Sequence, residues 1–224
     1  MNVLAIDTAT EACSVAASIG GVWAERFVEL GRGHTDALMP MIHAVMAELE
    51  ADLGVLDCIA VGRGPGAFTG VRIGVACVQG LAHGLNVPVV PVSNLAAMAW
   101  EAASKQGAWV AVAIDARAGG VYFGAYAVTP SALPECVVAE RVCPPDAVPA
   151  LDQRSVLTAG TGWSRHPEVL GAAVGCEQVD SGVRLPSARA IAELALLGAA
   201  QLPASELEPV YLRDQVVHSS ARKA

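Results

Sequence analysis

Two aspartates in matching settings are the residues best placed to do chemistry in this chain. Asp7 follows the apolar run VLAI and Asp115 follows VAVAI, and each precedes a turn and a second apolar run. A carboxylate at a strand end, together with backbone N–H groups of the next turn, can handle phosphate and Mg²⁺. Thr8 and Arg117 lie close to them in the sequence. The alternative is that each aspartate caps its own turn.

The two aspartates also head a short internal repeat. AIDTATEACSVAAS starts at Ala5 and AIDARAGGVYFGAY starts at Ala113. Repetition of this kind indicates two lobes of related topology. The pattern resembles the actin, Hsp70 and sugar-kinase class of ATPases, in which two Asp-bearing hairpins of ribonuclease H-like lobes face the nucleotide. The resemblance implies a nucleotide-phosphate region formed by Asp7, Thr8, Asp115 and Arg117. The resemblance implies an α/β, two-lobed fold, and the proline-rich stretch 129–149 indicates that the second lobe is reduced.

The first lobe is predicted over residues 1–105. VLAIDTA, CSVAASIGG and VWAERFVEL predict three antiparallel strands, with a Gly-Gly turn between the last two. Helical spacing covers residues 35–50, 68–84 and 93–107, and the strands CIAVG and VPVVPV separate these helices. The resulting order is βββαβαβα, and residues 106–224 form the second, smaller lobe.

The glycine-rich stretch GRGPGAFTGVRIG, from Gly62 to Gly74, precedes and enters the second of these helices. It lacks the lysine of the phosphate-binding pattern GxxxxGK[ST] and also lacks the dinucleotide fingerprint. Thr69 and the free N–H groups at the helix start could still hold an anion, as other helix N-termini do. Thr69 therefore joins the predicted nucleotide-phosphate region.

The helices over 35–50 and 68–84 are unusually rich in apolar and small residues. On the second helix such residues cover about two-thirds of the circumference, more than an ordinary surface helix needs. A glycine inside a helix costs up to ~1 kcal/mol against alanine, so its glycines favour close approach of another helix. The first helix carries three of the five methionines, a residue common on partner-binding surfaces. The alternative is that both helices are simply core. The predicted partner interface consists of Met39, Ile42, Val45, Met46, Gly70, Val71, Gly74, Val75 and Val78.

Composition excludes other classes of function. The net charge is −8 and no basic run occurs, so the chain alone should bind nucleic acid poorly. The six cysteines show no CxxC pair, which predicts reduced thiols. We see neither a signal peptide nor an apolar stretch of the ~18 to 20 residues that span a bilayer, and we expect a cytoplasmic protein without membrane contact.

Five segments together resemble the bacterial TsaB (YeaZ) family: LAIDTATEACSVA, GRGPGAFTGVRIG, AIDARAGGVYF, GTGW at 160–163 and EPVYLR at 208–213. This resemblance implies a role in making threonylcarbamoyladenosine at position 37 of tRNAs that read codons beginning with A. It further implies a non-catalytic scaffold that works with the catalytic paralogue TsaD and the ATPase TsaE. The paralogues would join through the first-lobe helices. Alone, the chain is expected to form a homodimer, and to meet tRNA only indirectly.

The resemblance also bears on metal, cofactor and catalysis. The catalytic paralogue holds its metal with two histidines four residues apart, and the matching positions here are Asn94 and Met98, which are poor substitutes for imidazole. No HExxH motif is present. We expect no catalytic or metal-binding residue and no cofactor beyond weakly held or interface-bound ATP or ADP with Mg²⁺. The alternative function is an ATP-dependent phosphotransferase of the sugar- or acetate-kinase class, motivated by Asp7, Thr8 and Asp115.

Overall fold

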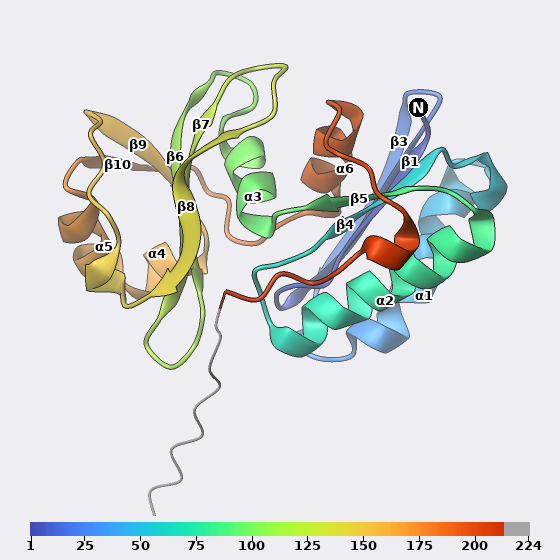
Figure 1. The fold of residues 1–224 in the computed structure, drawn as a ribbon, viewed down its shortest axis with the longest axis horizontal. Helices are drawn as coiled ribbons and strands as arrows, with labels where there is room; N and C mark the ends of the chain where they lie inside the picture. Colours follow the sequence, from blue (N-terminus) through green and yellow to red (C-terminus); the bar gives the residue numbers. More distant parts are fainter. Residues whose placement is uncertain (213–224) are drawn as a thin grey trace, which may run out of the picture.

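The computed structural model describes residues 1–212. The last residues of the predicted second lobe, 213–224, lie outside the described part. They include Arg213, which ends the EPVYLR motif. The described chain folds into two five-stranded sheets with helices between them and on their outer faces (Figure 1).

The first sheet has the strand order β3-β2-β1-β4-β5. Its strands are β1 (Val3–Asp7), β2 (Ala12–Ile19), β3 (Val22–Glu29), β4 (Cys58–Gly62) and β5 (Val89–Val92). β1, β2 and β3 are antiparallel, whereas β4 and β5 run parallel to β1. All residues of β1 and β4 are buried, as expected for central strands covered on both faces.

The second sheet repeats this arrangement with the order β8-β7-β6-β9-β10. Its strands are β6 (Ala108–Asp115), β7 (Val121–Val128), β8 (Glu135–Cys143), β9 (Ser155–Ala159) and β10 (Glu177–Asp180). The first three are antiparallel and the last two run parallel to β6. The predicted α/β fold with two lobes of related topology is therefore confirmed.

In the described residues 1–212, six α-helices complete the fold in three layers. They are α1 (His34–Glu48), α2 (Phe68–Leu85), α3 (Asn94–Ala103), α4 (Thr161–Arg165), α5 (Pro167–Val174) and α6 (Ala188–Leu196). α1 and α2 cover the outer face of the first sheet, and α4 and α5 cover that of the second (Figure 1). α4 and α5 have 5 and 8 residues against 15 and 18 for α1 and α2, so the second lobe is reduced, as predicted.

The middle layer consists of α3 and α6, which fill the space between the two sheets (Figure 1). One buried apolar cluster joins them to both sheets, from Ala5 and Ala60 on the first to Val112 and Tyr126 on the second. The two lobes therefore share a continuous core.

That the lobes divide at residue 105 stays a prediction. The helix α6, however, does not keep to the second lobe. Although α6 belongs to the predicted second lobe by its position in the chain, it packs against β1, β2, β4 and β5 of the first sheet. Its buried Ile191 contributes to the shared core. Sequence order alone therefore misplaces α6, because the chain crosses back after β10.

Over residues 1–212, none of the helices combines the length with the apolar character that a bilayer crossing demands.

Candidate functional site

The predicted phosphate-binding residues of the first lobe are buried. Asp7 ends β1 with 0% of its surface exposed, and Thr8 is 1% exposed. Asn94 Nδ2 donates to Asp7 Oδ1 at 2.6 Å, and Thr8 Oγ1 donates to the Gly70 C=O at 2.7 Å. Neither side chain presents an oxygen at the surface of this chain, and the nucleotide-phosphate region stays a prediction.

Asp7 is an unusual core residue electrostatically. Burial raises the pKa of Asp7 to about 7, although the hydrogen bond from Asn94 and the nearby N–H groups of Ala9 and Thr8 act in the opposite direction. Asp7 Oδ2 has no hydrogen-bond partner in the described part of the chain. The carboxyl is thus held neutral over much of the acidic range.

The glycines before and within the first turns of α2 allow this helix to lie close to the chain's own first hairpin. A Cβ on Gly70 would lie 2.2 Å from the Thr8 backbone oxygen, and one on Gly74 would lie 2.7 Å from Thr8 Oγ1. Gly66 is similarly constrained, with a Cβ 2.2 Å from the Ala9 oxygen. These close approaches explain why the sequence keeps glycine here, without a second subunit.

The second-lobe hairpin behaves differently. Asp115 Oδ1 accepts a hydrogen bond from the Arg117 N–H at 3.2 Å, and Arg117 has a φ of 60°. The turn-capping alternative therefore describes Asp115. Its other oxygen lies 3.6 Å from Arg165 Nη1, and Thr161 Oγ1 accepts from the Asp115 N–H at 3.1 Å. Arg117 is exposed, as is Thr69 in the first turn of α2.

The two positions compared with metal-binding histidines are both inside the core. Asn94 and Met98 on α3 are each 0% exposed. Besides donating to Asp7, Asn94 accepts from the Gly64 N–H at 2.8 Å, so it ties β1 to the loop before α2. Across residues 1–212, no cluster of three or more histidine, cysteine, aspartate or glutamate side chains is arranged to hold a metal.

Most of the predicted partner-interface residues are not on the surface. Ile42, Val45, Met46, Val71, Val75 and Val78 are at most 5% exposed, and Gly70 and Gly74 are also buried. The six apolar residues pack on the outer face of the first sheet, so the burial of these eight residues in this chain favours the core alternative. A long charged side chain at Gly74 or Val78 would disrupt this core instead of testing a partner. Of the nine, only Met39 is exposed, at 38%.

The exposed sides of α1 and α2 form a different surface, which we call the outer surface. Its members are mainly apolar, with the Arg72 guanidinium near the start of α2. Cys77 Sγ and Met39 Sδ, one from each helix, lie 4.0 Å apart. The outer surface consists of Met39, Phe68, Arg72, Ala76, Cys77 and Gly80.

A C-terminal segment borders this surface and was not predicted to do so. Gln79 Nε2 donates to the Leu207 C=O at 2.8 Å, and the Val210 N–H donates to the Arg63 C=O at 2.8 Å. Tyr211 then receives a hydrogen bond from Arg72 Nε at 2.6 Å, and its ring lies 5.4 Å from that of Phe68. The Arg72 guanidinium stacks over Phe68 at 3.6 Å. The EPVYLR motif singled out this segment in the sequence, but it did not predict that the segment contacts α2.

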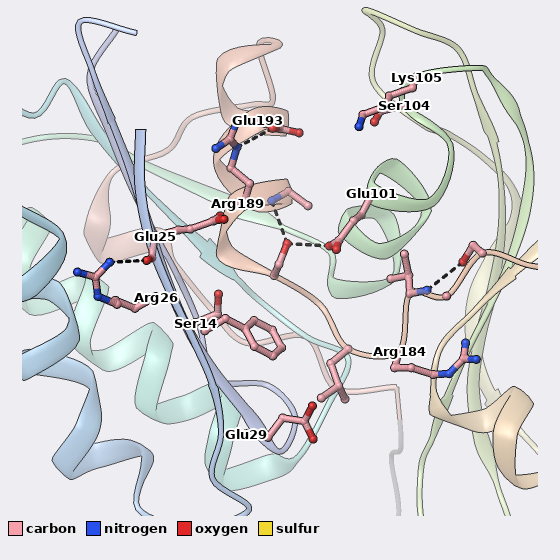
Figure 2. Close-up of a pocket in the computed structure, with 17 residues that line it drawn as sticks. Ser14, Glu25, Arg26, Glu29, Glu101, Ser104, Lys105, Arg184, Arg189 and Glu193 are labelled. Carbon is pink, nitrogen blue, oxygen red and sulfur yellow. Dashed lines mark hydrogen bonds and ion pairs between the residues drawn. The ribbon is translucent and has the colours of Figure 1, made fainter. Parts of the chain in front are cut away.

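A separate cavity of about 800 Å³ lies between the lobes, on the other side of the first sheet (Figure 2). β3, α3, α6 and the loop 181–187 line it. Ser187 caps α6 and donates to Glu101 Oε2 of α3 at 2.7 Å. Its lining is strongly charged, and sequence reasoning did not identify it.

Comparison with known proteins gives consistent results. A family model for TsaD, the tRNA N6-adenosine threonylcarbamoyltransferase, matches residues 3–203. The chain is 40% identical to the tRNA threonylcarbamoyladenosine biosynthesis protein TsaB of Escherichia coli, covering 96% of each chain. It is 38% identical to the protein of the same name from Haemophilus influenzae, covering 96% of this chain and 95% of the relative.

Solved structures of similar proteins share the whole fold. The Pseudomonas aeruginosa protein YeaZ superposes with a TM-score of 0.85 at 39% identity, covering 94% of this chain and 99% of that one. A second Pseudomonas aeruginosa structure, described as similar to the peptidase YeaZ, gives a TM-score of 0.86 at 38% identity over 95% of this chain and 99% of that one.

Proposed function

The chain belongs to the TsaB family, and from this premise we propose that it serves tRNA threonylcarbamoyladenosine biosynthesis as a non-catalytic scaffold. In this proposal it activates the catalytic paralogue TsaD, together with the ATPase TsaE, for modification at position 37 of tRNAs that read codons beginning with A. It acts in the cytoplasm and meets tRNA only through the complex.

The carrying observation is the outer surface of α1 and α2. Ala76 and Gly80 let another backbone approach closely, Met39 is adaptable, and Phe68 with Arg72 supplies the aromatic and guanidinium groups typical of binding hot spots. In the isolated chain the same surface would support a homodimer. The proposed interface thus stays on the two predicted helices, but it uses their exposed side chains and not the buried ones.

Further observations favour a scaffold over an enzyme. Asp7 and Thr8, which motivated the phosphotransferase alternative, are buried, and α3 and α6 fill the space between the sheets. We therefore do not carry that alternative further. The proposal expects ATP or ADP with Mg²⁺ to bind this chain only weakly or at the junction with the partner. Calorimetry of the purified chain with Mg-ATP should then be silent, whereas micromolar binding with turnover would contradict the scaffold role.

The decisive experiment places a charge on the outer surface. Ala76→Glu should weaken binding to TsaD at least tenfold, as truncation of a hot spot does, and should abolish tRNA modification by the reconstituted proteins. Ala132→Glu makes the same change at an exposed position of the second lobe and is the matched control. Melting temperatures should be equal. Unimpaired TsaD binding by Ala76→Glu would refute the interface.

A further inference from the structure

The cavity between the lobes continues along an open edge of the first sheet. Glu25, Phe27 and Glu29 of β3 line it, and because alternate residues of a strand share a face, all three point the same way. Phe27 pairs with Ser14 in the register, and Ser14 Oγ accepts from the Ala188 N–H at 2.9 Å. This face is therefore the one toward α6, opposite to α1 and α2.

The outer edge of β3 carries unpaired backbone groups. Within residues 1–212, the ladder of β3 is with β2 alone. Ile19 and Val22 flank a two-residue Gly-Gly turn, and such flanking residues form a hydrogen-bonded pair. Since hydrogen-bonded and free pairs alternate, the N–H and C=O groups of residues 23, 25, 27 and 29 point away from β2. In agreement, the Glu25 C=O accepts from the Arg26 side chain at 2.8 Å.

Once the ion pairs are set aside, the charges that line the groove do not cancel. Three lining arginines are paired: Arg26 with Glu48 at 2.6 Å, Arg184 with Asp180 at 2.6 Å and Arg189 with Glu193 at 2.7 Å. Glu25 and Glu29 have no ion-pair partner in the described chain, and Lys105 is the one lining cation there without such a partner.

Glu101 adds a third carboxylate on the wall opposite β3 (Figure 2). Burial raises the pKa of Glu101, and the Glu193 and Glu25 carboxylates raise it further, against the hydrogen bond from Ser187. Three carboxylates of the lining thus outnumber its one unpaired ammonium group in the described chain, and a cation entering the groove would be attracted by the excess negative charge.

We propose that this groove binds an extended basic peptide segment of a partner protein, which adds to β3 as a sixth strand. Main-chain hydrogen bonds to the free edge would provide affinity, and alternate Lys or Arg side chains would meet Glu25, Glu29 and Glu101. The Phe27 ring, 48% exposed, would cover the apolar stem of one of them. Because the groove and the outer surface lie on opposite faces of the first sheet, both can be occupied together.

Charge also argues against a second copy of the chain as the occupant. Pairing of β3 with β3 would bring Glu25 and Glu29 of two molecules to the same edge, and like charges placed opposite each other destabilise a sheet. An uncovered edge strand with exposed apolar residues such as Phe27 and Val28 is otherwise a liability for a folded protein.

The test uses the full-length chain and the synthetic peptide acetyl-Thr-Lys-Val-Lys-Thr-Lys-Val-amide, with binding followed through backbone amide NMR shifts at low salt. Residues 23–29 should shift. The double variant Glu25→Gln/Glu29→Gln should weaken binding about three- to tenfold. A peptide with Glu in place of each Lys, and one N-methylated at alternate residues, should not bind.

Phe27→Pro removes an outward N–H without touching the ladder to β2, and Phe27→Ala is its matched control. Loss of binding in the proline variant alone is the expected result. Equal binding of the N-methylated peptide, or unchanged affinity in the Gln variant, would overturn the proposal. It would also be overturned if the Gln substitutions moved amide signals of residues 213–224, or if Phe27→Pro abolished a dimer of the free chain. Those results would assign the groove to the chain's own tail or to a second copy.

Discussion

The two hairpins that carry Ala-Ile-Asp show how one sequence pattern acquires two environments. Asp7 is wholly buried and hydrogen-bonded to Asn94, and one of its oxygens has no partner among residues 1–212. Asp115 is partly exposed, caps its own turn and approaches Arg165. The strands around them have the same topology and direction, so the difference comes from elsewhere.

The helices that follow account for the difference. In the first lobe, the 18-residue α2 and its glycines press onto the turn after β1, and α3 brings Asn94 to the same point. In the second lobe the corresponding place is taken by the five-residue α4, and the turn remains open to solvent. Local sequence therefore sets the hairpin, while the covering elements set the chemistry of its carboxylate.

The largest expected effect is on Asp7. Its pKa of about 7 in the fold exceeds the ordinary value of 3.8, so its favourable contribution is complete below pH 3.8 and is lost as the pH rises to about 7. Asp7→Asn removes this dependence. Between pH 4 and pH 8, the free energy of unfolding of the variant should therefore rise relative to wild type by roughly 4 kcal/mol, measured by urea denaturation.

Asp115→Asn is the matched control from the second lobe. An amide oxygen can still accept the Arg117 N–H, and the Arg165 contact is exposed, so Asp115→Asn should change the free energy of unfolding at pH 7 by less than about 1 kcal/mol. A change as large as that of Asp7→Asn would mean that the hairpins do not differ as described.

The second prediction tests the cover over the first hairpin. Gly70→Ala should destabilise the protein by about 1–3 kcal/mol, because the new methyl group would overlap the Thr8 backbone oxygen. Gly80→Ala, on the same helix but with nothing within 4 Å of its Cβ position, should instead stabilise by up to about 1 kcal/mol. Chemical denaturation of both variants checks the sign, and a neutral Gly70→Ala would remove the argument for close packing.

The third prediction concerns the contact between α2 of the first lobe and the C-terminal segment. Tyr211→Ala removes both the hydrogen bond from Arg72 and the stacked rings, and should cost about 1 kcal/mol. Hydrogen exchange of the Val210 N–H should accelerate. This group donates to the Arg63 C=O, and Val210 directly precedes Tyr211. Tyr211→Phe keeps the ring and should show about half the effect. Unchanged Val210 exchange in Tyr211→Ala would show that the contacts of Tyr211 with Arg72 and Phe68 do not hold the C-terminal segment on α2.

The smallest effect is expected at Arg165. Its guanidinium lies 3.6 Å from Asp115 with 67% of the side chain exposed, so water and salt screen the pair. Arg165→Gln should change the free energy of unfolding by less than about 0.5 kcal/mol in denaturant titrations. A loss above 1 kcal/mol would instead make Asp115 an anchored residue like Asp7.

Strand and helix positions could be predicted because apolar periodicity and turn residues are local. The two lobes, the order of elements in the first lobe and the reduced second lobe followed from such signals together with the repeat at Ala5 and Ala113. Which face of a helix is buried did not follow. Val78 and Gly74 have the same character whether they meet a sheet of their own chain or another subunit, and only the fold decides between these.

The long-range contacts were also beyond the sequence. Nothing near Asp7 indicates that Asn94 will reach it across 87 positions, and nothing near Ser14 indicates a bond to the backbone at residue 188. The groove beside β3 depends on such contacts, because its walls come from four separate parts of the chain. In the sequence alone, Glu25, Glu29 and Glu101 look like ordinary surface glutamates.

The return of α6 to the first sheet has a consequence for how the protein is made. Residues of β1 leave the ribosome first, yet α6, which covers their inner face, is completed only at Leu196. Until then Ala5, Ala16 and Ala60 lack part of their cover, and the nascent first lobe exposes a sticky apolar sheet. Translation pauses or truncations before residue 188 should therefore yield chains that depend on chaperones, even though most of their strands are already present.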